Sequence, residues 1–108
     1  MKTATVFTAG AALALTALLG TAPAMAQDAE ALAKSKNCFA CHAVDKKVVG
    51  PSYKDVAAKF ADDPGAVDML ADRIKNGSSG VWGAVPMPPN NVTEEEAKQL
   101  AEWVMSMK

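Results

Sequence analysis

The chain has 108 residues, 50% of them hydrophobic, and a formal net charge of −1 at pH 7. This length suits one small domain and is too short for two. Lysines and carboxylates are mixed along the sequence, without the basic cluster that nucleic-acid binding requires. The composition therefore favours one small domain and excludes a nucleic-acid-binding function.

Residues 1–26 have the pattern of a secretory signal peptide. Met1 and Lys2 give a short positive start, the run Ala4–Leu19 carries no charge, and Ala24-Met25-Ala26 offers a small-x-small cleavage pattern. The alternative is an uncleaved membrane anchor, but the apolar run falls short of the roughly 20 residues that span a bilayer. We predict cleavage after Ala26, a mature domain over residues 27–108 in the periplasm, and no stable membrane insertion.

The mature segment contains four short amphipathic patterns and no alternating run long enough for a strand. The first runs from Asp28 to about Asn37, with Asp28 placed to cap the helix or to favour its positive start. The second covers Ser52–Phe60, where Ser52 and Asp55 resemble a capping box. These patterns predict an all-α domain.

The third and fourth patterns complete the predicted helices. The third begins after Pro64-Gly65 and ends at Asn76-Gly77, where a left-handed C-cap is easily made. The fourth begins at Thr93, whose hydroxyl and the side chain of Glu96 form a capping box, and we expect it to reach the C-terminus. Helical spacing predicts that the following residues face inward: Ala29, Leu32, Ala33, Tyr53, Val56, Ala57, Phe60, Val67, Leu70, Ala71, Ile74, Ala97, Leu100, Ala101, Val104 and Met107.

The segment Cys38-Phe39-Ala40-Cys41-His42 has the C-x-x-C-H pattern by which c-type haem is attached. On a helical turn, residues three and four apart share a face. Cys38 and Cys41 can therefore bond the two vinyl groups of the porphyrin while His42 turns its imidazole toward the iron. A mature domain of about 80 residues also gains stability from a cofactor. We predict one covalently bound haem c, with His42 as an axial iron ligand.

Three other interpretations of this motif need to be weighed. A disulfide between Cys38 and Cys41 would leave His42, the only histidine in the sequence, without a purpose. A thioredoxin-like redox pair is expected near a βαβ pattern, which the sequence does not show. A structural zinc site generally needs four ligands, and the chain has only 2 cysteines and 1 histidine. Haem attachment explains all three residues together.

Met87 is the expected ligand at the sixth coordination position of the iron. It lies in Pro86-Met87-Pro88-Pro89-Asn90, within a connection from Gly77 to Val92 that has no helical period. The prolines fix φ and remove backbone donors, so this segment is stiff and cannot be helical. The alternative is a methionine that only packs against the haem or the core. If Met87 were displaced from the iron, the chain would be a haem enzyme or a gas-binding protein rather than an electron carrier.

Residues 27–108 resemble the cytochrome c-551 family of bacterial class I c-type cytochromes. The resemblance rests on four blocks in the family's order and spacing: C-F-A-C-H, V-V-G-P-S-Y-K-D-V-A-A-K-F, R-I-K-N-G-S-S-G-V-W-G-A-V-P-M-P-P-N and L-A-E-W-V-M-S-M-K. It implies an all-α fold of about four short helices wrapped around one covalent haem. The first and last helices would cross, and one haem edge would be exposed.

The resemblance also implies residues that support the two axial ligands. The carbonyl of Pro51 would accept the Nδ1 hydrogen of His42, which fixes the tautomer and makes the ligand more basic. Asn90 would hold the Met87 loop by hydrogen bonding near the sulfur.

Further residues receive a role toward the haem from the resemblance. Arg73 and Trp82 would donate hydrogen bonds to a haem propionate. Two alanines depart from the commoner family pattern: Ala33 replaces a bulkier apolar residue, and Ala84 replaces a proline before the Val-Pro-Met run. The pocket would be lined by Leu70, Ile74, Leu100 and Val104.

These expectations describe an electron-transfer protein and not an enzyme. The predicted function is that of a soluble, monomeric, periplasmic one-electron carrier with a low-spin haem and a fairly positive potential. The resemblance implies donation to a nitrite reductase or a terminal oxidase, with a membrane cytochrome complex or a small copper protein upstream. Docking would use Val48, Val49 and Val85 near the haem edge, with surrounding lysines such as Lys34, Lys36 and Lys47.

Overall fold

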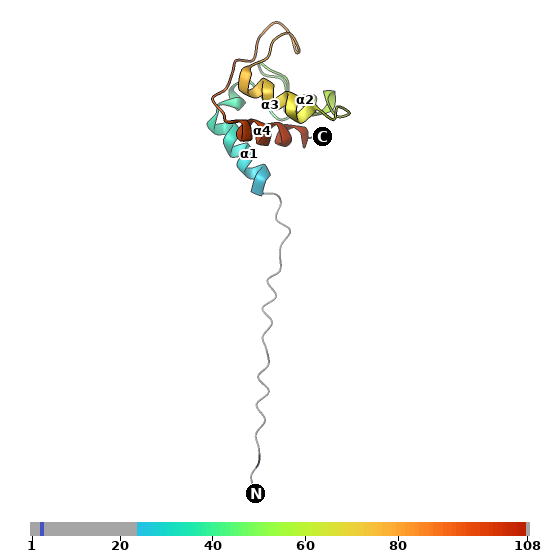
Figure 1. Cartoon of the computed structure of the whole chain (residues 1–108). Helices are drawn as coiled ribbons and strands as arrows, with labels where there is room; N and C mark the ends of the chain where they lie inside the picture. The colour runs from blue at the N-terminus through green and yellow to red at the C-terminus, as the bar shows by residue number, and fades with distance from the viewer. Residues whose placement is uncertain (1–2, 4–23, 108) are drawn as a thin grey trace.

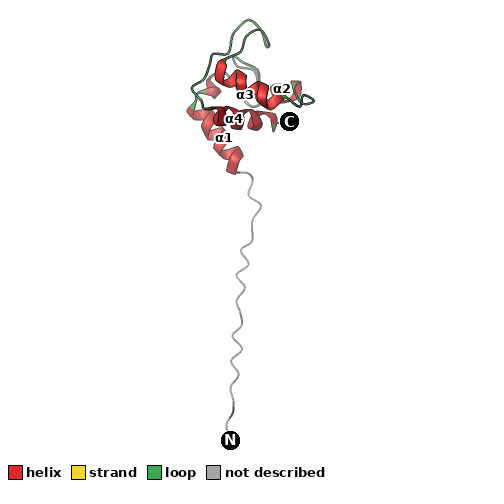
Figure 2. Cartoon of the chain, viewed as in Figure 1, coloured by secondary structure: helices red, strands yellow, loops and turns green. Residues whose placement is uncertain are grey.

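The computed structural model describes Thr3 and residues 24–107, so most of the predicted signal segment, residues 1–26, lies outside the described residues. In this part of the chain the helical elements are α1 (Ala24–Ser35), the 3-10 helix η1 (Cys38–Ala40), α2 (Tyr53–Lys59), α3 (Ala66–Asn76) and α4 (Glu94–Met105). Loops join them, and no strand occurs among the described residues (Figure 2). The all-α prediction is confirmed. No helix in the described ranges has the length and apolar character needed to cross a membrane.

The first helix differs from its prediction at both ends. α1 begins at Ala24, so Asp28 lies inside the helix and is not its N-cap, and the first turn holds no acidic residue. Alanine, methionine and glutamine favour helix, which extends α1 ahead of Asp28. At the other end α1 stops at Ser35, because Asn37 takes a left-handed φ of 61° before η1 begins. The helix still buries Ala29 and Ala33 as the spacing predicts.

The ends of α2 and α3 are set by single residues. The hydroxyl of Ser52 accepts a hydrogen bond from the backbone N–H of Asp55 at 3.0 Å, which caps α2. α3 ends at Asn76, and its C-cap residue Gly77 has φ 89° and ψ 168°. The positive φ agrees with the predicted C-cap, but the extended ψ does not correspond to a left-handed helical cap. Gly77 instead turns the chain directly into a paired segment described below.

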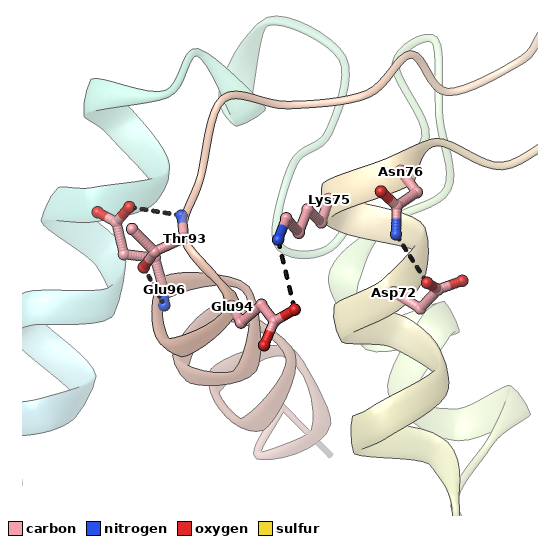
Figure 3. A network of polar contacts seen from close by, with 6 residues as sticks. All are labelled: Asp72, Lys75, Asn76, Thr93, Glu94 and Glu96. Carbon is pink, nitrogen blue, oxygen red and sulfur yellow. Dashed lines mark hydrogen bonds and ion pairs between the residues drawn. The ribbon is translucent and has the colours of Figure 1, made fainter.

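A capping box begins α4, and an ion pair ties it to α3 (Figure 3). The Thr93 hydroxyl accepts from the Glu96 N–H at 3.1 Å, and the Glu96 carboxylate accepts from the Thr93 N–H at 2.9 Å. This prediction is confirmed. Lys75 of α3 lies 3.5 Å from Glu94, but both side chains are exposed, so the pair contributes little to stability.

The core forms where the other helices meet α4. α4 packs against α1, α2 and α3, and Figure 1 shows α1 crossing α4 while the connection from α3 to α4 arches away from the helices. α4 ends at Met105 instead of continuing to the C-terminus as predicted. The next residue, Ser106, donates a side-chain hydrogen bond to the Trp103 carbonyl. Two adjoining clusters of buried residues form the core; they contain Tyr53, Val56, Leu70, Ala101 and Val104, and Ala33, Val92, Ala97 and Leu100.

Candidate functional site

The two cysteines and the histidine form one tight turn. Asn37, in its left-handed conformation, directs the chain from α1 into η1. The carbonyl of Cys38 then accepts from the N–H groups of Cys41 and His42, at 3.2 and 3.0 Å. Cys38, Cys41 and His42 all line the same cleft, and both thiols are free. The turn thus presents two sulfur atoms and one imidazole to a single space.

The imidazole of His42 is held from several directions. Its Nδ1 lies 2.7 Å from the carbonyl oxygen of Pro51. Because a carbonyl only accepts, Nδ1 carries the hydrogen, and the lone pair of Nε2 is free to bind a metal. The ring of Tyr53 stacks on the imidazole, with centroids 5.3 Å apart and an interplanar angle of 26°. A Cβ at Gly50 would lie only 2.5 Å from Cε1 of His42.

A paired segment holds Met87 at the edge of the cleft. Two backbone hydrogen bonds join Ser78 and Met87, one in each direction, at 2.9 and 2.8 Å. The side-chain amide of Asn90 donates to the carbonyl of Ile74 at 2.9 Å and to that of Pro88 at 3.4 Å. Asn90 therefore anchors this loop to the end of α3 through backbone carbonyls. Met87 lines the same cleft as the C-x-x-C-H turn.

The cleft also contains Arg73 of α3 and Trp82 of the connecting loop. Arg73 has a buried Nη1 that finds no hydrogen-bond partner within the described part of the chain. Buried polar groups are normally paired. This nitrogen therefore points to an acceptor that is not part of the polypeptide. Trp82 is 38% exposed, which places it at the boundary between the cleft and solvent.

The remaining walls of the cleft are mostly apolar and come from every helix. The cavity volume is about 230 Å³. The residues predicted to line it all do so: Leu70, Ile74, Leu100 and Val104. Sequence reasoning did not single out Tyr53 as a neighbour of His42, because its helical spacing indicates only a core residue. A C-x-x-C-H turn and a methionine that line one apolar cleft of an all-α fold are the features of a small class I c-type cytochrome.

Comparisons with known proteins agree with this class. The family model described as cytochrome c matches residues 26–108. Cytochrome c-551 of Stutzerimonas stutzeri is 67% identical over 96 residues, covering 89% of this chain and 92% of the relative. Cytochrome c-551 of Pseudomonas aeruginosa is 59% identical over 100 residues, covering 88% and 96% respectively. The crystal structure of wild-type Nitrosomonas europaea cytochrome c552 superposes with a TM-score of 0.72 at 57% identity, covering 73% of this chain and 99% of that one.

The chain belongs to the cytochrome c family, in its bacterial cytochrome c-551 branch. Its cofactor is one covalently bound haem c, and it is an electron-transfer protein and not an enzyme.

The residues around the cleft fit this cofactor. Burial raises the pKa of the Cys38 thiol, and this outweighs a backbone hydrogen bond that lowers it. The raised pKa keeps this thiol in its neutral, protonated form at pH 7, and a thioether is likewise uncharged. The unpaired Nη1 of Arg73 suits a propionate carboxylate, and the apolar walls suit a porphyrin face.

Proposed function

We propose that the chain is exported, loses residues 1–26, and carries single electrons between periplasmic redox proteins, with haem c held by Cys38, Cys41, His42 and Met87. One observation supports this assignment above the others. The C-x-x-C-H turn and the proline-flanked Met87 loop, distant in sequence, line the same apolar cleft.

Each of these residues has a distinct role in the proposal. Cys38 and Cys41 would hold the haem through thioether bonds to its two vinyl groups. The Nε2 of His42 and the sulfur of Met87 would bind the iron. Haem bound in this way supplies an iron that gains and loses one electron.

The side chains around the cleft adjust that electron transfer. The Pro51 carbonyl accepts the Nδ1 hydrogen of His42 at 2.7 Å, which makes the imidazole a stronger donor to the metal. A thioether ligand and apolar surroundings both favour the reduced, less charged state and raise the potential. With His42 and Met87 both bound to the iron, small molecules would find no open position on it.

Partner proteins would approach where the cleft meets solvent. Val48, Val49 and Val85 are exposed by 48%, 51% and 67%, and the last two line the cleft. Lys47 also lines it and can steer an acidic partner toward this edge. Lys34 is paired with Glu30 at 3.3 Å, so its charge is partly offset. We propose a nitrite reductase or a terminal oxidase as acceptor and a membrane cytochrome complex or a small copper protein as donor.

The assignment of Met87 is tested by optical spectroscopy of protein produced with a haem-maturation system. We expect the wild type to show a low-spin reduced spectrum that carbon monoxide leaves unchanged, together with the weak near-infrared band of methionine bound to ferric iron. Met87→Ala should lose that band and bind carbon monoxide. Met69→Ala is the matched control, because Met69 of α3 is partly buried against the core and is not among the described residues that line the cleft. Identical spectra for the wild type and Met87→Ala would refute Met87 as the ligand.

Export is tested separately by mass spectrometry of the intact periplasmic protein. We expect a chain that begins at Gln27 and carries one covalent porphyrin, because the small-x-small pattern ends at Ala26. A product that retains Met1 in the membrane fraction would contradict cleavage and favour an anchor.

A further inference from the structure

Phe60 joins two of the cleft residues although it is distant from them in sequence. It directly follows α2 as its C-cap residue and is partly buried against the core. Its ring faces Arg73 from α3 and Trp82 from the long connecting loop. Phe60 thus connects the end of α2 with α3 and with the long connecting loop.

The contact with Arg73 orients a cation. The guanidinium carbon of Arg73 lies 5.6 Å from the centroid of the Phe60 ring, within the range of a cation–π interaction. The same side chain has the buried Nη1 without a partner in the described residues. The ring of Phe60 therefore supports the guanidinium on one side while a nitrogen remains free for an acceptor.

The contact with Trp82 anchors a loop residue. Phe60 and Trp82 meet edge to face, with centroids 6.4 Å apart and an interplanar angle of 83°. The ammonium of Lys59 lies 4.8 Å from the centroid of the Trp82 ring. The residues around Trp82 are not helical, so these side-chain contacts restrain an indole that no regular element holds.

Neither Phe60 nor Lys59 is among the described residues that line the cleft, whereas Arg73 and Trp82 both are. Whatever Phe60 does for a bound group must therefore pass through Arg73 and Trp82. This separates its role from those of the residues that touch the group.

We propose that Phe60 is a positioning residue that holds the Arg73 guanidinium and the Trp82 indole as a pair of donors to one carboxylate of the bound cofactor. Lys59 restrains Trp82 alone. The inference rests on the proposed function, because the carboxylate is a haem propionate. It adds two residues, Phe60 and Lys59. The sequence does not indicate that either of them helps to hold that carboxylate.

Hydrogen exchange measured by NMR on the reduced, haem-loaded protein tests this role. In Phe60→Leu we expect the indole N–H of Trp82 and the guanidinium N–H groups of Arg73 to exchange about tenfold faster, the size of effect expected when a partly buried cation–π contact is lost. Phe60→Tyr keeps the aromatic face and should restore wild-type exchange. Val67→Ala, which removes volume from the same core cluster, should change neither rate. Exchange within twofold of wild type in Phe60→Leu, or equal acceleration in Val67→Ala, would overturn the proposal.

Lys59→Gln gives a second test at an exposed position that folding tolerates. Only the Trp82 indole should respond, by about threefold, because an exposed cation–π contact is weaker than a buried one. Equal acceleration at Arg73 and Trp82 would show that Lys59 acts on the whole region, contrary to the proposal.

A double-mutant cycle then shows whether Phe60 acts through Arg73. Phe60→Leu should shift the reduction potential in the wild type and shift it less in an Arg73→Gln background, where only the contact of Phe60 with Trp82 remains. The same shift in both backgrounds would overturn the inference about Phe60. The proposed function would still stand if the wild type shows its low-spin spectrum. A wild type isolated without covalent porphyrin would overturn the proposed function and this inference together.

Discussion

One tetrapeptide, Gly50-Pro51-Ser52-Tyr53, constrains the imidazole of His42 in three ways. Gly50 leaves room beside Cε1, Pro51 accepts from Nδ1, and Tyr53 stacks on the ring. The same segment is bonded back to the motif, since the N–H of Gly50 donates to the Cys41 carbonyl at 2.7 Å. The orientation of the histidine is thus fixed by a segment that begins eight residues after it and folds back onto its motif.

Gly50→Ala tests this constraint. The added methyl would lie 2.5 Å from Cε1 and 2.9 Å from Nδ1 of His42, so the ring must move and its hydrogen bond to Pro51 must weaken. We expect a stability loss of about 1–3 kcal/mol in urea unfolding, as for other overpacked sites, and an altered ferric EPR spectrum.

Gly65→Ala is the matched control for this experiment. Its added methyl would meet only a carboxylate oxygen of Asp63 at 3.4 Å, an ordinary contact. We expect a change within about 0.5 kcal/mol, typical of surface substitutions. If Gly50→Ala behaved like Gly65→Ala, the close approach of Gly50 would not restrain the histidine.

The residues of the site differ in how far sequence alone predicts them. The C-x-x-C-H motif and the proline-flanked Met87 are local patterns with a chemical reason, so they stand out directly. Arg73 and Trp82 required the family resemblance, because a cleft arginine and a solvated arginine look the same in sequence. Phe60 was expected only as a core residue, because its two partners lie far along the chain and helical spacing does not indicate them.

At the level of elements, the apolar faces were predictable and several ends were not. Helical spacing identifies buried Ala33, Leu70 and Ala101 because core packing selects them. The predicted start of α1 at Asp28 was wrong, because the alanine-rich residues ahead of Asp28 also favour helix. The geometry at Gly77 depends on the hydrogen bonds between Ser78 and Met87, a pairing that no local pattern specifies.

Gly77→Ala should loosen Met87 for two reasons. Gly77 has φ 89°, and an added methyl would lie 3.0 Å from the Met87 carbonyl oxygen and 3.1 Å from Cδ of Pro89. The backbone strain alone costs about 1–3 kcal/mol, because a positive φ with an extended ψ is a region that essentially only glycine adopts. We expect weaker methionine ligation, measured as partial loss of the near-infrared band and new carbon monoxide binding.

The control is Gly80→Ala in the same loop. Gly80 also has a positive φ, 77°, but an added methyl would meet nothing within 4 Å. This variant should lose similar stability while its near-infrared band stays intact. Equal loss of the band in both variants would attribute the effect to backbone strain and not to crowding of the Met87 loop.

At the scale of the whole molecule, several of the large apolar side chains form the walls of the cleft. Many of the most deeply buried residues are alanines: Ala29, Ala33, Ala57, Ala66, Ala97 and Ala101. Larger side chains such as Tyr53, Leu100 and Trp103 line the cleft. Small side chains bury little apolar area, so the helices gain limited stability from each other alone. A cofactor that fills the cleft completes the core.

Folding should therefore depend on haem attachment. We expect the Cys38→Ala, Cys41→Ala double variant, purified without porphyrin, to lack near-UV circular dichroism and a cooperative urea transition, because a domain of about 80 residues has little stability to spare. The haem-loaded wild type should show both signals. Removing two sulfur atoms cannot itself explain such a loss, since Cys41 is exposed and Cys38 only partly buried. A cooperative transition in the porphyrin-free variant would mean that the alanine-rich helix contacts suffice, and that the cofactor serves electron transfer without organising the fold.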